Sequence, residues 1–184
     1  SASDVEGDDL SISATSDNEN VTVSVVNGTL TLTPAENFNG LANIIVSVSD
    51  GELSDSETFV FTVNSVNDKP SFEYTDVVVV NEDSGLYEAS WAFNISVGPD
   101  NESDQIPTFE IISNDHESYF SIQPSISELG VLTFTPADNQ HGEAIITVRL
   151  TDNGGTTNEG DNTYDDQTFT IKLNPIADTP NITD

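Results

Sequence analysis

GTLTLTPAENFNGLANIIVSVSD (residues 28–50) occurs a second time as GVLTFTPADNQHGEAIITVRLTD (residues 130–152), with 12 of 23 positions identical at an offset of 102 residues. A second pair follows, DSETFVFTVNSVNDKP (residues 55–70) against DDQTFTIKLNPIADTP (residues 165–180), at an offset of 110. Apolar and polar residues alternate in both copies, which is the pattern of half-buried strands. A repeat of this length with strand-like alternation indicates tandem copies of one β domain.

Short strand-like runs fill both copies, and helical periodicity is nearly absent. Val21, Val23 and Val25 alternate with polar residues in the first copy, as Phe169 and Ile171 do in the second. Gly, Asn, Asp and Pro separate these runs. Many short strands punctuated by turn residues predict an all-β chain of two tandem antiparallel β-sandwiches.

The two copies differ in length at their beginnings. Residues 71–96 of the second copy contain two strand-like segments, 77–80 and 91–95, for which the first copy has no counterpart. The first domain is therefore expected to start at its third strand, with an exposed core and an unpaired edge that frays or is completed by another chain. The expected domains are residues 1–69 (truncated at the N-terminus), 70–180 (complete), and 181–184, the start of another repeat or a tail.

A second length difference lies in the loop after Asp152. The offsets of 102 and 110 imply an insertion of eight residues within NGGTTNEGDNTYDD. We expect this insertion to form an exposed hairpin extension.

The charge of the chain limits its possible partners. There are 33 Asp and Glu residues against three Lys and Arg, for a net charge of −30. Nucleic acid and anionic membrane surfaces are excluded as partners, because both require clustered basic residues. No apolar run is long enough to insert into a bilayer. The chain has no Cys, so a bound metal is the obvious alternative to disulfides as a source of rigidity.

Acidic residues recur at equivalent places in the repeat. The linker VNDKP (residues 66–70) has a counterpart in IADTP (residues 176–180), and both end in a Pro that breaks the β ladder. Acidic loops and strand ends recur as well, at Asp4, Glu6, Asp50, Asp100, Glu102 and Asp152. Ends of alternate strands meet at one pole of a sandwich, and calcium takes six to eight oxygen ligands from such groups. Asn67, Asp68, Asp100, Glu102 and Asp152 form one candidate calcium site.

The linker VNDKP, the entry loop SASDVEGD and the paired Asp50 and Asp152 resemble the calcium-dependent cadherin fold, specifically the cadherin-like repeats of bacterial surface proteins. The resemblance covers nearly the whole chain. It implies cadherin-like or immunoglobulin-like Greek-key sandwiches with calcium bound between successive domains. Lys69 departs from the family pattern, which often has an amide at this position.

The resemblance also assigns further residues. Glu36 of the first domain would contribute to the central joint. Glu82, with Asp138 and Asp178, would serve the next joint downstream. Asp4, Glu6 and Asp50 would be half of an upstream site. The implied function is a calcium-stiffened adhesion or spacer segment of a secreted or cell-surface protein, without enzymatic activity.

Other interpretations remain open at this point. The acidic residues are also explained by solvation in a salty environment. A carbohydrate-binding module of an extracellular polysaccharide-associated protein is the competing function, with an exposed Trp91 as a stacking platform; packing of Trp91 in the second core is the alternative. Homophilic protein contacts are a third possibility. An EF-hand is excluded, because DVEGDDLSISAT has neither Gly at its sixth position nor Glu at its twelfth.

Overall fold

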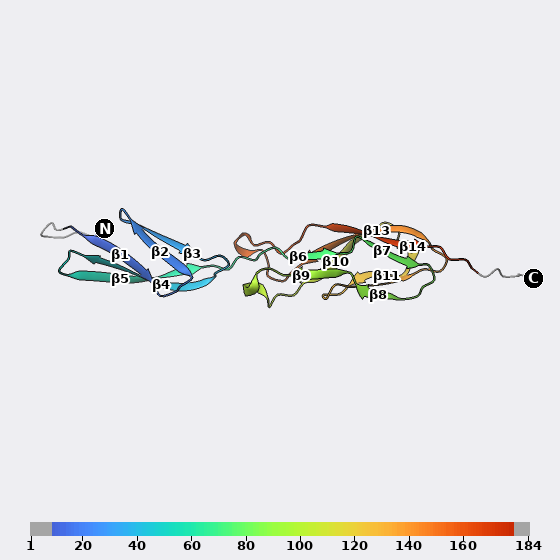
Figure 1. Ribbon diagram of the computed structural model, residues 1–184, viewed down its shortest axis with the longest axis horizontal. Helices are drawn as coiled ribbons and strands as arrows, with labels where there is room; N and C mark the ends of the chain where they lie inside the picture. The colour runs from blue at the N-terminus through green and yellow to red at the C-terminus, as the bar shows by residue number, and fades with distance from the viewer. Residues whose placement is uncertain (1–8, 179–184) are drawn as a thin grey trace, which may run out of the picture. The chain divides into compact units, whose positions relative to one another are not determined.

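The computed structural model describes residues 9–178, which form fourteen strands and three short 3₁₀ turns and contain no α-helix (Figure 1). The chain divides into two compact units, Ser1–Ser65 (unit 1) and Val66–Asp184 (unit 2). The prediction of two tandem all-β domains is confirmed. The domain boundary that the sequence suggested, after Lys69, lies inside unit 2.

Unit 1 contains five strands among its described residues. They are β1 (Ser11–Ser16), β2 (Val21–Val26), β3 (Thr29–Pro34), β4 (Gly40–Ser49) and β5 (Ser54–Val63). β1, β4 and β5 form one antiparallel sheet, and β2 and β3 form a hairpin. Asn27 and Gly28 connect β2 to β3 with φ values of 50° and 76°, which a two-residue type I′ turn requires. Val21, Ala42 and Ile44 form the buried centre of the unit.

Unit 2 contains nine strands in its described part, residues 66–178. They are β6 (Ser71–Tyr74), β7 (Val77–Asn81), β8 (Tyr87–Ser90), β9 (Ala92–Ser96), β10 (Thr108–Asn114), β11 (Phe120–Ile126), β12 (Val131–Pro136), β13 (Gly142–Thr151) and β14 (Gln167–Asn174). The 3₁₀ turns are η1 (Asp100–Glu102), η2 (Glu117–Tyr119) and η3 (Thr157–Glu159). One sheet has the order β10-β13-β14-β7, a second has the order β11-β12-β8, and β6 pairs with β9.

The pairing of β7 with β14 departs from a wholly antiparallel sandwich. The two strands run parallel, with Val77 opposite Thr170 and Asn81 opposite Asn174. Parallel neighbours require a long connection, and here the whole chain from β8 to β13 supplies it. The remaining strand pairs are antiparallel, as expected.

The core of unit 2 is built from alternate residues of its long strands. Ile146, Val148 and Leu150 of β13 are fully buried, and period-2 alternation places them on one face. Trp91 is 1% exposed, packs against Phe169 with ring centroids 4.4 Å apart, and donates its indole N–H to the carbonyl of Thr75 at 2.9 Å. The prediction that Trp91 packs in the second core is confirmed, and Trp91 forms no exposed platform.

The N-terminal segment of unit 2 contains more strands than the sequence suggested. Residues 71–96 form four strands, β6 to β9, rather than two. β1 to β5 of unit 1 correspond to β10 to β14 of unit 2. Among its described residues, unit 1 therefore begins at the equivalent of β10, the fifth strand of unit 2. The sequence had suggested a start at the third strand.

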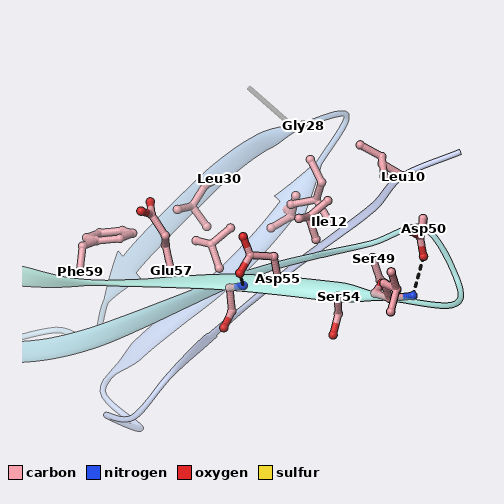
Figure 2. Close-up of a pocket in the computed structure, with 15 residues that line it drawn as sticks. Leu10, Ile12, Gly28, Leu30, Ser49, Asp50, Ser54, Asp55, Glu57 and Phe59 are labelled. Atoms are coloured by element: carbon pink, nitrogen blue, oxygen red, sulfur yellow. Dashed lines mark hydrogen bonds between the residues drawn. The ribbon is translucent and has the colours of Figure 1, made fainter. Parts of the chain in front are cut away.

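An open groove of about 930 Å³ lies between the strands of unit 1 (Figure 2). Leu30 and Phe59 line it together with the carboxylates of Asp55 and Glu57. Phe59 is 42% exposed, whereas its counterpart Phe169 is 2% exposed beneath the additional strands of unit 2. Unit 2 thus has the more complete core.

Candidate metal centre at the linker end of unit 2

Three polar side chains are buried where the linker enters unit 2. Asn67, Glu102 and Asp152 are 8%, 8% and 6% exposed. Asn67 precedes β6, Glu102 ends η1, and Asp152 directly follows β13. Polar groups at this depth require partners, since burying them without hydrogen bonds is unfavourable.

Asn67 and Asp152 are joined directly. Asn67 Nδ2 donates to Asp152 Oδ1 at 3.0 Å and to the carbonyl of Asp161 at 2.9 Å. Asn67 Oδ1 accepts from Gln105 Nε2 at 2.7 Å. Asp152 Oδ1 also accepts the main-chain N–H of Gly154 at 2.9 Å. The side chain of Asn67 is therefore held at both of its polar atoms.

Glu102 receives the main chain of the linker. The N–H of Asp68 donates to Glu102 Oε1 at 3.1 Å and to Oε2 at 3.2 Å. A methyl group on Gly98 would overlap the Glu102 carboxylate, so glycine at this position leaves the space that the carboxylate occupies. Burial raises the pKa of Glu102, and the charges of Asp68 and Asp152 raise it further, while the bond from the Asp68 N–H opposes them. The ionised carboxylate is thus destabilised unless positive charge approaches.

Two oxygen atoms near Asn67 are left without partners. Asp152 Oδ2 and Gln105 Oε1 are both buried, and neither accepts a hydrogen bond from residues 9–178. The unpartnered groups are oxygens, one carboxylate and one amide, and this is the donor chemistry that hard cations such as calcium prefer. The donor set therefore fits calcium. Gln105 was not expected from the sequence, because it has no counterpart in the acidic repeat and only the fold brings it to Asn67.

The loop after Asp152 is largely exposed, as the sequence suggested, but it is more than a hairpin extension. It contains η3, and it packs on the linker. The N–H of Asp161 donates to the carbonyl of Asn67 at 3.0 Å. Lys69 Nζ lies 3.0 Å from Asp165 Oδ1 and 5.5 Å from the centroid of the Tyr164 ring. The inserted residues bond to the linker because its buried polar groups need partners.

The remaining residues expected at this centre are exposed or lie elsewhere. Asp68 and Asp100 have exposed side chains, and Asp100 begins η1. Glu36 is exposed in the turn between β3 and β4 of unit 1. Within residues 9–178, no three side chains of the types His, Cys, Asp and Glu are grouped so that they could hold a metal ion. The groups that lie together are therefore two carboxylates, Glu102 and Asp152, and two amides, Asn67 and Gln105.

Asp50, the counterpart of Asp152, is arranged differently. Its Oδ1 accepts the main-chain N–H groups of Glu52 at 2.8 Å and Leu53 at 2.7 Å, the second of which Figure 2 shows. These bonds, led by the one from Leu53, lower the pKa of Asp50. Asp50 thus closes the turn between β4 and β5. Asp4 and Glu6 lie outside the described residues.

Glu82 occupies the opposite end of unit 2. It is 4% exposed, accepts the N–H of Ile176 at 2.8 Å, and lies 3.3 Å from His141 Nδ1. β7 ends beside the last residue of β14, whereas Asp152 and Asp161 lie near the beginning of β14. Asp138 and Asp178 are exposed. The structure brings Glu82 to the exit segment but shows no contact of Glu82 with Asp138 or Asp178.

Two protein families match the chain. The cadherin-like domain matches residues 1–64, and the bacterial Ig domain matches residues 67–174, which is more than half of the chain. The chain belongs to the bacterial Ig domain family. The cadherin-like resemblance inferred from the linker and the repeat is also confirmed. No curated protein matches the chain.

Solved structures similar to this bacterial Ig and cadherin-like tandem include human cadherin fragments. Human protocadherin-24 EC1-2 in form II has a TM-score of 0.58 and 17% identity, covering 92% of this chain and 84% of that chain. A further structure of human protocadherin-24 EC1-2 has a TM-score of 0.57 and 15% identity, covering 97% and 86%. Human mucin-like protocadherin EC1-2 has a TM-score of 0.48 and 19% identity, covering 91% and 84%. At these identities, the likeness to the two protocadherin-24 structures shows the fold alone.

Bacterial Ig and cadherin-like domains are adhesion-type folds that are typical of extracellular or surface proteins, and they are typically not enzymes. Cadherin-like domains generally bind calcium. The described part of the chain includes no helix with the length and apolarity needed to cross a membrane.

Proposed function

We propose that this chain is a calcium-binding segment of a secreted or cell-surface adhesion protein, and that calcium binds at the linker end of unit 2. The observation that carries the proposal is the unpartnered Asp152 Oδ2, which belongs to a side chain only 6% exposed. A buried carboxylate oxygen without a donor is unfavourable, and a cation would relieve this. The exposed carboxylates of the chain provide no comparable argument, because water solvates them.

The neighbouring groups support a hard cation. Glu102, Asp152 and Gln105 would hold the ion through oxygen, with Asp68 and Asp100 as exposed carboxylates beside them. Calcium would supply the positive charge that the ionised form of Glu102 lacks. A transition metal is disfavoured, because the described residues around Asn67 offer neither imidazole nor thiolate. The contribution of Glu36 from unit 1 stays a prediction.

The mechanical role follows from the place of the centre in the chain. Asn67 and Asp68 form the segment by which one domain follows the other, and calcium would tie this segment to Glu102 and Asp152 of unit 2. Bound calcium would thereby strengthen the hold of unit 2 on this connecting segment and reduce the self-repulsion of a chain with net charge −30. Extracellular calcium modules bind at about 10⁻⁴–10⁻³ M, so occupancy would report extracellular conditions.

The test is thermal unfolding of the whole chain in millimolar calcium, in magnesium, and in excess chelator. The fluorescence of Trp91, the single tryptophan, follows unit 2 specifically. Calcium at one hundred times its dissociation constant should stabilise unit 2 by about 2.7 kcal/mol, and magnesium should do less because it dehydrates reluctantly. Glu102→Gln should remove most of the gain. Identical melts in calcium and chelator would refute the proposal and leave the acidic residues as solvating groups.

A further inference from the structure

The loop between β13 and β14 is much longer than its counterpart in unit 1. It spans residues 152–166, whereas residues 50–53 connect β4 to β5. A four-residue turn is sufficient to join two such strands, as unit 1 demonstrates. The additional residues of unit 2 extend to the linker and make contacts that the short turn has no residues to make.

Asn67 bonds to Asp161 in the way that one strand residue bonds to another. Its carbonyl accepts the N–H of Asp161 at 3.0 Å, and its side-chain Nδ2 donates to the carbonyl of Asp161 at 2.9 Å. The side-chain amide takes the place of a main-chain N–H, which gives the two-bond exchange of an antiparallel pair. The linker is thus paired to the loop through one residue.

The same side chain is also bonded on its other sides. Gln105 donates to Asn67 Oδ1 at 2.7 Å, and Asn67 Nδ2 donates to Asp152 Oδ1 at 3.0 Å. Asp152 Oδ1 accepts from Gly154 as well, so this oxygen has two donors and Oδ2 has none. Asn67 and the Gly154 N–H therefore together hold Asp152 Oδ1 and leave Oδ2 without a donor.

Two glycines give the loop room to approach. A Cβ on Gly154 would overlap Asn67 Oδ1, and a Cβ on Gly160 would lie 2.8 Å from the main-chain N of Asn67. Contacts this close require the neighbour to move. Any side chain at either position would push Asn67 away from the loop.

We propose that the β13–β14 loop is a clamp on Asn67 that forms without metal, and that Asn67 is a positioning residue that orients Asp152 for a divalent cation. The metal-free clamp stands on the hydrogen bonds alone, whereas the orienting role rests on the proposed calcium site. The linker from Asn67 to Lys69 would consequently remain part of unit 2 when calcium is removed.

Hydrogen exchange of the whole chain in excess chelator tests the clamp. The amide of Asp161 should exchange at least tenfold more slowly than in an unfolded chain, because it donates to Asn67. Gly160→Ala should remove this protection, while the amides of β13 and β14 keep theirs. Thr156→Ala, at an exposed position of the same loop, is the control and should change nothing. Exchange of Asp161 at the unfolded rate in the wild-type chain would overturn the clamp.

A double-mutant cycle read by calcium titration tests the orienting role. Gly160→Ala, whose new methyl group would lie against the main-chain N and the Cβ of Asn67, should weaken calcium binding about tenfold, and Asn67→Ala should do the same. Because the new methyl group acts through Asn67, the double variant should bind no more weakly than Asn67→Ala alone. Additive losses would refute the role of Asn67 as an intermediary.

The two arms distinguish the proposals. If the wild-type chain does not bind calcium, the proposed function fails and the orienting role fails with it. The exchange measurement still decides the metal-free clamp, since it is made entirely in chelator.

Discussion

Asn67 Nδ2 lies 3.0 Å from Asp152 Oδ1, which joins the linker to the end of a strand 85 residues later. Both side chains are more than nine-tenths buried. Asp50, at the repeat position of Asp152, bonds only within its own turn in the described structure. Equivalent aspartates thus have different surroundings, which makes Asp50 a matched control for Asp152.

The first prediction compares these two aspartates. Asp152→Asn should abolish the calcium-dependent rise in the melting temperature of unit 2, because it removes the charge on the unpartnered oxygen. Asp50→Asn, the matched control, should keep the full rise. Melting curves with calcium and with chelator, followed by Trp91 fluorescence, measure both. An undiminished calcium effect in Asp152→Asn would place the ion elsewhere.

Glu102 should give the metal-free chain a characteristic pH dependence. The folded protein raises the pKa of Glu102 above its usual 4.5, mainly through burial. Folded Glu102 then binds its proton more tightly than unfolded Glu102, so its contribution to the unfolding free energy falls as pH rises from about 4.5 through the raised pKa.

Glu102→Gln should remove this contribution. The variant should gain stability relative to the wild type across the same pH interval, and the gain should stay constant at higher pH. Urea unfolding in chelator at several pH values measures it, and saturating calcium should reverse the order of the two proteins. A stability difference independent of pH would contradict the prediction.

The dependence of stability on pH that Asp115 contributes should have the opposite sign to that of Glu102. Its pKa is lowered by His116 first and then by the N–H of Ile145, which donates to Asp115 Oδ1 at 2.7 Å. The contribution of Asp115 to stability is therefore fully present at pH values above about 3.8, the usual pKa of Asp. It is lost as the pH falls through the lowered pKa of the folded protein. The difference in unfolding free energy between the wild type and Asp115→Asn should shrink between pH 5 and about pH 2. A constant difference would show that the Asp115 carboxylate does not stabilise the fold through its charge.

Leu132 and Leu30 hold the same position in the two copies but differ in burial. Leu132 is fully buried, whereas Leu30 is half-buried beside the groove of unit 1. Leu132→Ala should destabilise unit 2 by about 2–5 kcal/mol through lost burial and a residual cavity. Leu30→Ala should destabilise unit 1 by clearly less, about 1 kcal/mol, since solvent already reaches the side chain. Urea unfolding by Trp91 fluorescence for unit 2 and by circular dichroism for unit 1 tests the order.

Gly130 and Gly28 form a second matched pair. Both have left-handed φ values, 77° and 76°. A Cβ on Gly130 would lie 2.5 Å from the carbonyl oxygen of Ala92, whereas a Cβ on Gly28 would meet nothing within 4 Å. Gly28→Ala should destabilise by about 1 kcal/mol from the left-handed backbone alone. Gly130→Ala should destabilise unit 2 by a further ~1–3 kcal/mol through the steric overlap with β9. Equal losses of stability in the two units would show that β9 moves away from the new methyl group without destabilising unit 2.

Much of the fold was predictable because it is local. Alternation in runs such as Ile44 to Val48 places successive side chains on opposite faces, and the turn residues Asn27 and Gly28 allow only certain backbone angles. The repeat between residues 28–50 and 130–152 then implies that both copies fold alike. These features depend on neighbours a few positions apart, so they can be read from the chain in order.

The chemistry of the centre was predictable only in part. The recurrence of Asp152 and Glu102 indicated where acidic groups would gather, but the sequence offered no reason to prefer these residues to exposed ones such as Asp68. Burial distinguishes them, and burial depends on all segments packed around a residue. No repeat pattern in the sequence indicated Gln105.

The sequence by itself determined the alternating strands and the turns, since these follow from residue types and spacings of a few positions. It also shows the tandem repeat and the net charge of −30 directly. Only the tertiary structure decided that the inserted loop, although largely exposed, hydrogen-bonds to Asn67. It also decided that Asp152 has one oxygen satisfied and one without a partner, while Asp50 closes a turn. These outcomes depend on contacts between residues far apart in the chain, because a buried polar atom takes whichever partner the assembled fold brings within reach.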